Sequence, residues 1–173
     1  MNQQEPIQID VLLEFRDFLR ANYWYLFKKF RLLFVMLFIG GVFYPILYFS
    51  GAAGEISNAQ SYWGFLVIPG LFFFLLLSTY LGARRHMKSN RGIQEETRYS
   101  FSENGINAVA ESSSGHTSWS NIRDAYETKN SFLLFISNNQ MYTVPKRFFH
   151  SREQVDSFRQ LLLSELQSRA KLK

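Results

Sequence analysis

The feature that most constrains this chain is a long stretch that is almost free of charge. Between Arg31 and Arg84, the only charged residue is Glu55. Glu55 divides the stretch into two uncharged segments, Leu32 to Gly54 and Ile56 to Ala83. Each segment is at least as long as the roughly 20 apolar residues with which a helix crosses the hydrocarbon core of a bilayer.

The sequence therefore predicts two transmembrane helices, at 32–50 and 63–82, joined by an extracytoplasmic loop at 51–62. The alternative is a pair of helices buried in a soluble core. Helices that are apolar on every side need a large surrounding protein to cover them, and the rest of this chain is mostly polar. A cleaved signal peptide fits poorly, because the first apolar segment starts late and is too long.

Basic residues flank both predicted spans and predict their orientation. Three precede the first span and four follow the second: Lys28, Lys29, Arg31, Arg84, Arg85, Lys88 and Arg91. The connecting loop has no Lys or Arg, so the positive-inside rule places both termini in the cytoplasm. The expectation is a multi-pass protein of the inner cell membrane. These residues also account for the net charge of +5, which argues against nucleic-acid binding.

Two cytoplasmic parts complete this interpretation. The segment 1–31 combines a short strand at 6–9 with an amphipathic helix that starts near Asp10, a favourable N-cap residue. A basic linker at 83–94 leads into a β-domain at 95–173.

The β-domain is predicted from short strands separated by turns over residues 97–149. Asn104-Gly105 is a strong hairpin signal, and Pro145 ends the last of these strands. Ser151 and Gln154 then form a capping box for a helix at 152–169. One apolar stripe of this helix is expected to pack on the sheet: Val155, Phe158, Leu161, Leu162 and Leu166. The predicted fold class is an α+β membrane protein with two transmembrane helices and a small antiparallel sheet closed by a carboxy-terminal helix.

The order and spacing of four short runs resemble the YcxB-like family of bacterial membrane proteins. The runs are Tyr99 to Ile106, Trp119 to Ile122, Phe132 to Phe135 and Val144 to Phe149. The resemblance implies a fold similar to pleckstrin-homology-like (PH-like) domains, a bent antiparallel sheet capped by a helix. Such folds carry more strands than this sequence shows, so that 6–9 is a candidate for a further strand. The family is functionally uncharacterised, and it implies no catalytic residues.

A search for chemistry finds no catalytic, metal-binding or cofactor-binding motif. The chain has no Cys, which excludes thiolate catalysis and Cys-ligated zinc. Its three histidines, His86, His116 and His150, show no metal-ligand spacing. Ser113 and His116 lie in a predicted turn without a nucleophile elbow, and no phosphate-binding glycine loop occurs. The expectation is a protein that is not an enzyme and uses no cofactor.

Two basic clusters are candidate anion contacts. The first either attracts anionic lipid or only sets topology: Arg84, Arg85, Lys88 and Arg91. The second, at the strand-to-helix junction, either binds an acidic peptide or phosphate or is solvated surface: Lys146, Arg147 and Arg152.

The function expected from these observations is non-enzymatic. The protein would present a small cytoplasmic interaction or regulatory domain at the inner membrane, with membrane lipids and a protein partner as its contacts. The alternative is an oligomeric channel or transport accessory subunit that self-associates through Gly40 and Gly41.

Overall fold

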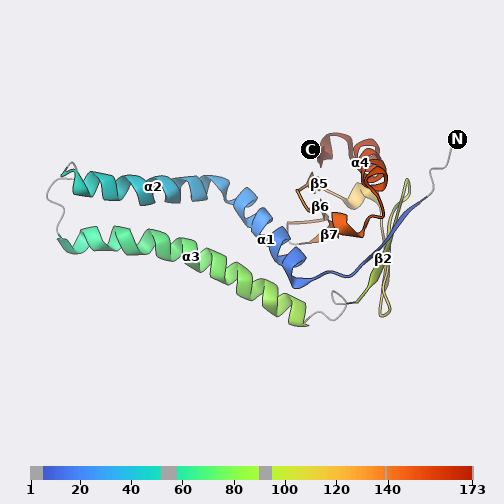
Figure 1. The fold of residues 1–173 in the computed structure, drawn as a ribbon, viewed down its shortest axis with the longest axis horizontal. Helices are drawn as coiled ribbons and strands as arrows, with labels where there is room; N and C mark the ends of the chain where they lie inside the picture. The colour runs from blue at the N-terminus through green and yellow to red at the C-terminus, as the bar shows by residue number, and fades with distance from the viewer. Residues whose placement is uncertain (1–5, 52–57, 90–94, 139, 173) are drawn as a thin grey trace. The chain divides into compact units, whose positions relative to one another are not determined.

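The computed structural model describes residues 6–51, 58–89, 95–138 and 140–172 (Figure 1). The chain divides into two compact units. One contains Met1–Phe18 together with Met87–Lys173, and the other contains Leu19–His86. Over the described residues the fold is α+β, with two four-stranded sheets and four α-helices.

The first sheet joins the start of the chain to the β-domain. Its order is β1-β2-β3-β4, with every neighbouring pair antiparallel. The strands are β1 (Ile7–Val11), β2 (Thr97–Ser102), β3 (Gly105–Val109) and β4 (Ser114–Thr117). The predicted strand at 6–9 is found as β1, which begins one residue later and ends at Val11. Its Ile7 pairs with Phe101 of β2.

The turn between β2 and β3 requires a glycine. Gly105 has a φ of 132°, a backbone angle that residues other than glycine rarely adopt. A Cβ atom at this position would also lie 2.4 Å from the backbone oxygen of Thr117 on β4. The hairpin predicted at Asn104-Gly105 is confirmed.

The second sheet has the order β7-β6-β5-β8. Its strands are β5 (Asp124–Glu127), β6 (Ser131–Phe135), β7 (Met141–Pro145) and the short β8 (Ala170–Lys171), which runs parallel to β5. A 3-10 turn, η2 (Trp119–Asn121), lies between the two sheets in the sequence. Trp119 is buried there, and its indole nitrogen donates to the backbone oxygen of Ser102 at 2.8 Å.

One helix closes the core of this unit, α4 (Arg152–Leu166). It follows the 3-10 turn η3 (Lys146–Phe148) and is followed by η4 (Gln167–Arg169). Ser151 caps α4 by accepting from the backbone N–H of Gln154, as predicted. The apolar stripe of α4 joins side chains of both sheets in a single buried cluster, with Phe158 4.5 Å from Phe101 and 5.0 Å from Phe132 between ring centroids.

The helix predicted to begin near Asp10 begins later. Asp10 belongs to β1, where its carboxylate pairs with Arg98 at 2.8 Å. The helix α1 runs from Phe15 to Lys29, and the boundary between the units falls within it, after Phe18. The pairing of β1 with β2 overrides the local N-cap preference of Asp10, since a strand in a sheet cannot at the same time start a helix.

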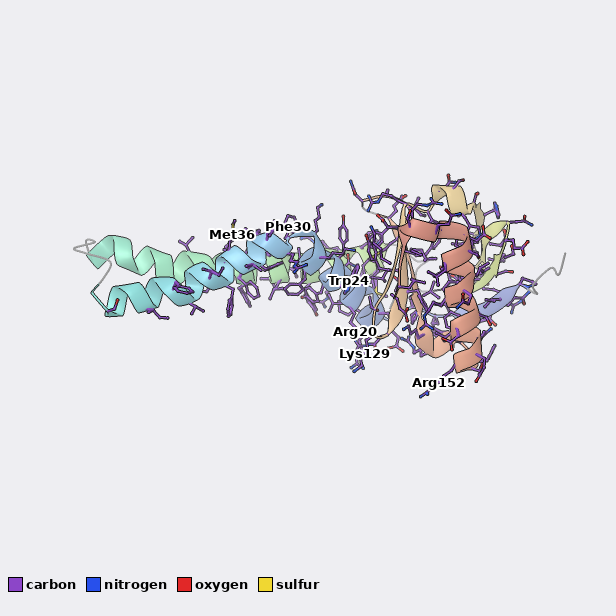
Figure 2. The ribbon with its side chains drawn as sticks, turned by 90° about the horizontal axis from the view of Figure 1, so that it is seen from above. Arg20, Trp24, Phe30, Met36, Lys129 and Arg152 are labelled. Carbon is purple, nitrogen blue, oxygen red and sulfur yellow. The ribbon has the colours of Figure 1, made fainter. Side chains whose placement is uncertain are left out.

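The second unit contains the rest of α1, together with α2 (Arg31–Phe49) and most of α3 (Asn58–Ser89). Tyr23 donates its hydroxyl to the backbone oxygen of Leu76 at 3.2 Å, and Phe34 meets Phe72 edge to face. Several large apolar side chains of α2 and α3 are exposed, among them Leu32, Met36, Phe38, Phe73 and Phe74 (Met36 is labelled in Figure 2).

Among the helices of the described residues, none has both the length and the apolar character that a membrane crossing requires. This finding contradicts the transmembrane helices predicted at 32–50 and 63–82. It likewise contradicts the membrane-protein fold class and the multi-pass inner-membrane location with both termini in the cytoplasm. The part of the predicted loop at 52–57 lies outside the described residues.

The physical reason lies in what the prediction counted. It counted uncharged residues, whereas a span needs about 20 consecutive apolar residues in one helix. α2 has 19 residues and starts with the charged Arg31. α3 has 32 residues but begins with Asn58-Ala-Gln-Ser, contains Pro69, and ends in a basic segment.

A buried tyrosine in the core leads to a prediction about how stability depends on pH. Tyr99 is buried against Phe101 and Tyr142, and burial raises the pKa of its phenol to about 12. A phenol whose folded pKa exceeds its unfolded value of about 10 keeps its proton in the folded state, so stability is lost as pH rises from about 10 to 12. We expect the free energy of unfolding to fall by about 2–3 kcal/mol over this range through Tyr99.

Urea unfolding of the full chain at a series of alkaline pH values measures this fall. Tyr99→Phe should remove most of it. Tyr126→Phe, which changes a partly exposed tyrosine, should leave it in place. An equal fall in wild type and Tyr99→Phe would contradict the prediction.

Candidate functional site

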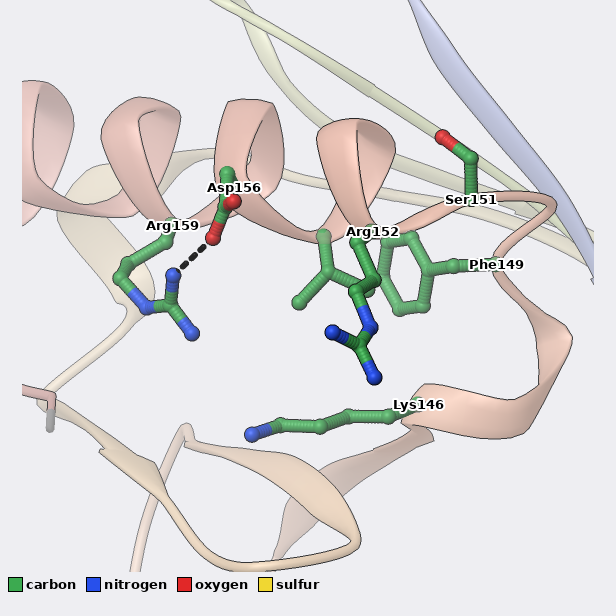
Figure 3. Close-up of a pocket in the computed structure, with 7 residues that line it drawn as sticks. Lys146, Phe149, Ser151, Arg152, Asp156 and Arg159 are labelled. Carbon is green, nitrogen blue, oxygen red and sulfur yellow. Dashed lines mark hydrogen bonds and ion pairs between the residues drawn. The ribbon is translucent and has the colours of Figure 1, made fainter.

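A cavity of about 490 Å³ lies between η3 and the first two turns of α4 (Figure 3). Its lining combines basic side chains with an apolar wall. The lining residues are Lys146, Phe149, Ser151, Arg152, Val155, Asp156 and Arg159.

The periodicity of α4 places its lining residues together. Arg152, Asp156 and Arg159 are four and three residues apart, so they share one face of the helix. The core stripe that contains Phe158 and Leu162 occupies another face. The same helix thus seals the core with one face and lines the cavity with the other.

Glu127, at the end of β5, fixes two of the cavity's cations. Its side chain is 3% exposed. One carboxylate oxygen accepts from Lys146 Nζ at 2.5 Å and from Arg159 Nη2 at 2.8 Å, and the other accepts from Arg159 Nε at 3.0 Å. The fork between Arg159 and Glu127 is the geometry in which arginine and carboxylate bind most strongly. The hydrogen bonds that Arg159 donates to Glu127 raise the pKa of its guanidinium.

Arg152 differs from these two cations. It is exposed at the first turn of α4 (Figure 2). Over residues 6–51, 58–89, 95–138 and 140–172 it forms no ion pair. Figure 3 shows its guanidinium in the space between α4 and the side chain of Lys146. Arg159, by contrast, also pairs with Asp156. The three cations of the cavity therefore face two carboxylates, those of Glu127 and Asp156, which leaves one positive charge in excess.

The wall of the cavity is apolar and belongs to the core. Phe149 is 8% exposed and packs against Phe132 and Phe158, with ring centroids 6.1 and 5.3 Å away. Val155 is partly buried and packs on the same cluster. These side chains are held in place by their core contacts, and their remaining surface faces the cavity.

Arg147 is turned away from the cavity, toward the start of α1. Its guanidinium donates to Asp17 Oδ1 at 2.5 Å and to Glu14 Oε1 at 3.2 Å. Asp17 is 4% exposed, and its other oxygen accepts from the backbone N–H of Glu14. The hydrogen bond to Asp17 raises the pKa of Arg147. Of the predicted junction cluster, Lys146 and Arg152 share the cavity and Arg147 instead anchors α1.

The other predicted basic cluster lies on α3. Arg84, Arg85 and Lys88 are exposed near the end of that helix, and Arg91 lies outside the described residues.

None of the three histidines is among the residues that line the cavity. The ring of His116 contacts the amide oxygen of Asn107 at 2.7 Å, and His150 donates its backbone N–H to Gln154. No group of three or more His, Cys, Asp or Glu within the described ranges could hold a metal ion.

Sequence reasoning missed Arg159 and Glu127. Each carries a signal in retrospect. Arg159 follows Arg152 by seven residues, which is two helical turns and hence the same face. Glu127 lies two residues after the buried Ala125 in β5, so the two side chains share the inward face of the strand.

Comparison with known proteins identifies the β-domain. Residues 101–162 match the family model of the YcxB-like protein family. The chain is also similar to the uncharacterized protein YcxB of Bacillus subtilis (strain 168), with 26% identity over 126 residues, which cover 72% of this chain and 66% of the relative. The matched part thus covers slightly less than two thirds of that protein. No solved structure matches the chain. All residues that line the cavity, and Glu127, fall within residues 101–162.

Glu127→Gln tests the structural role of the buried carboxylate. The substitution removes the charge that offsets Lys146 and Arg159, whose side chains are 24% and 25% exposed. Because these partners are partly solvated, we expect a loss of about 2–3 kcal/mol in the free energy of unfolding, below the full cost of breaking a buried pair. Chemical denaturation measures it. Glu111→Gln, at an exposed acid, should change stability little, and equal losses in both variants would refute the role of Glu127.

Asp17 and Glu14 form a matched pair for testing the anchor of α1. Both contact Arg147, but Asp17 is 4% exposed and the Glu14 side chain is 60% exposed. Asp17→Asn should cost about 1–3 kcal/mol of stability, because it weakens a charge-assisted hydrogen bond at a buried site. Glu14→Gln should cost less than about 0.5 kcal/mol, as is usual for exposed pairs. Equal effects in thermal or urea unfolding would contradict this ranking.

Proposed function

Because the chain belongs to the YcxB-like family and its cavity lies within the segment that the family model matches, we propose that this domain is a non-enzymatic binding module. It binds an oxyanion of a partner in the cavity between η3 and α4. The proposal keeps the interaction domain expected from the sequence and gives it a defined site.

The observation that carries the proposal is the position of Arg152. A guanidinium presents five N–H donors in a fork that matches carboxylate and phosphate oxygens. In the described part of the chain the guanidinium of Arg152 forms no ion pair. It lies at a cavity that holds one positive charge in excess. Lys146 and Arg159 line the same cavity, and both donate hydrogen bonds to Glu127.

The composition of the cavity supports binding rather than catalysis. Its walls offer cations, an apolar surface, one carboxylate that is paired with Arg159, and the hydroxyl of Ser151, which accepts from the backbone N–H of Gln154 as the cap of α4. A general base needs hydrogen-bond reach to a proton on the substrate and a pKa suited to accepting it. Asp156 is already engaged by the guanidinium of Arg159, so its carboxylate is not free to reach a substrate proton.

Binding of benzoate and benzamide to the full chain tests the proposal. The two molecules have nearly the same shape, and only benzoate carries a negative charge. In an amide-shift titration by NMR, we expect benzoate to perturb the first turn of α4 and η3, and benzamide to bind at least about tenfold more weakly, since charge-assisted hydrogen bonds are about twice as strong as neutral ones.

Arg152→Ala should weaken benzoate binding by about tenfold or more, because it removes the uncommitted guanidinium. Arg98→Ala is the matched control. It removes one exposed arginine that pairs with Asp10 between β2 and β1 and does not line the cavity, so benzoate affinity should not change. Equal binding of benzoate and benzamide, or equal effects of the two substitutions, would overturn the proposal.

A further inference from the structure

The cavity is much larger than a small oxyanion alone would fill. Its volume is about 490 Å³, within the range of roughly 300–1,000 Å³ typical of small-molecule sites. A water molecule takes up about 30 Å³ of liquid, and an acetate ion has only four heavy atoms. A small oxyanion held at Arg152 would therefore leave most of the cavity to water.

The surface left over beside such an ion is apolar and rigid. Phe149 contributes its ring, which Phe132 and Phe158 hold from behind. Val155 lies one helical turn after Arg152 and packs on the same core cluster. Covering this surface with apolar atoms releases the water in contact with it, which is favourable in proportion to the area covered.

The charge of the cavity restricts the headgroup. Lys146 and Arg159 are already offset by Glu127, and Arg159 also by Asp156, which leaves the single excess positive charge on Arg152. A carboxylate carries one negative charge at neutral pH, and a phosphate monoester carries about 1.5 to 2. A monoanion neutralises this cavity, whereas a phosphate dianion leaves a negative charge in excess beside Asp156.

From these three observations we propose that the ligand of this cavity is a carboxylate on an aromatic or branched apolar body. The carboxylate pairs with the fork of Arg152, and the body covers Phe149 and Val155. The inference rests on the proposed function, because it specifies the ligand class of the same site.

Four probes on the full chain test this class: benzoate, acetate, phenyl phosphate and benzamide. Benzoate should bind at least about tenfold more tightly than acetate, because only benzoate reaches the apolar wall. Phenyl phosphate should bind no more tightly than benzoate. Acetate as tight as benzoate would overturn the apolar part of the inference, and tighter phenyl phosphate would overturn the carboxylate part. In either case the discrimination of benzoate against benzamide would still support the proposed function.

Val155→Thr tests the wall directly. The substitution keeps the shape of the side chain and adds a hydroxyl to the apolar surface, so benzoate affinity should fall about threefold or more while acetate affinity stays the same. Val109→Thr, on β3 at a side chain that is exposed and does not line the cavity, is the matched control and should change neither. A parallel loss of benzoate and acetate affinity in Val155→Thr would show a general structural effect and overturn the role of Val155. Loss of the distinction between benzoate and benzamide in the wild type would instead remove the proposed function itself.

Discussion

The buried carboxylate of Glu127 is the interaction on which the described site depends. A carboxylate that is 3% exposed has lost nearly all its contact with water, and only close cations can offset that cost. Lys146 on η3 and Arg159 on α4 do so from two different elements. The charge thereby ties the end of β5 to both walls of the cavity. The Glu127 carboxylate also fixes the positions of the Lys146 and Arg159 side chains, because it binds each of them at its charged end.

The compact unit that contains this site is not continuous in sequence. The family model matches residues 101–162, whereas the unit also includes Met1–Phe18. β1 supplies an outer strand of the first sheet through five residue pairs with β2. Asp17 then fixes the first turn of α1 to η3 through Arg147. Ile9 and Val11 of β1 are part of the buried cluster, so the start of the chain contributes to the same core as the matched segment.

Local signals in the sequence predicted the parts of the fold that depend on local chemistry. Asn104-Gly105 gave the hairpin because the turn needs positive φ, and Ser151 with Gln154 gave the start of α4 because capping involves residues three apart. Features that depend on distant pairing were missed. β8 is only two residues long and exists through its parallel pairing with β5. Glu127 receives both its partners from residues 19 and 32 positions away. The two-span prediction failed on a different ground. It placed helices where α2 and α3 lie, but among the described residues no helix has the length and apolar character that a membrane crossing requires.

The geometry of η3 explains why its two adjacent basic residues, Lys146 and Arg147, contact different parts of the domain. A 3-10 helix has three residues per turn, so consecutive side chains point about 120° apart. Lys146 and Arg147 are neighbours in sequence, yet Lys146 reaches Glu127 and the cavity while Arg147 reaches Asp17 and α1. They cannot form the single patch that their adjacency suggested. The cation that the proposed function assigns to a ligand comes from another element, and it is Arg152 at the first turn of α4. In the proposed binding mode the start of α4 therefore supplies the cation for the ligand, and η3 joins that cavity to the anchor of α1.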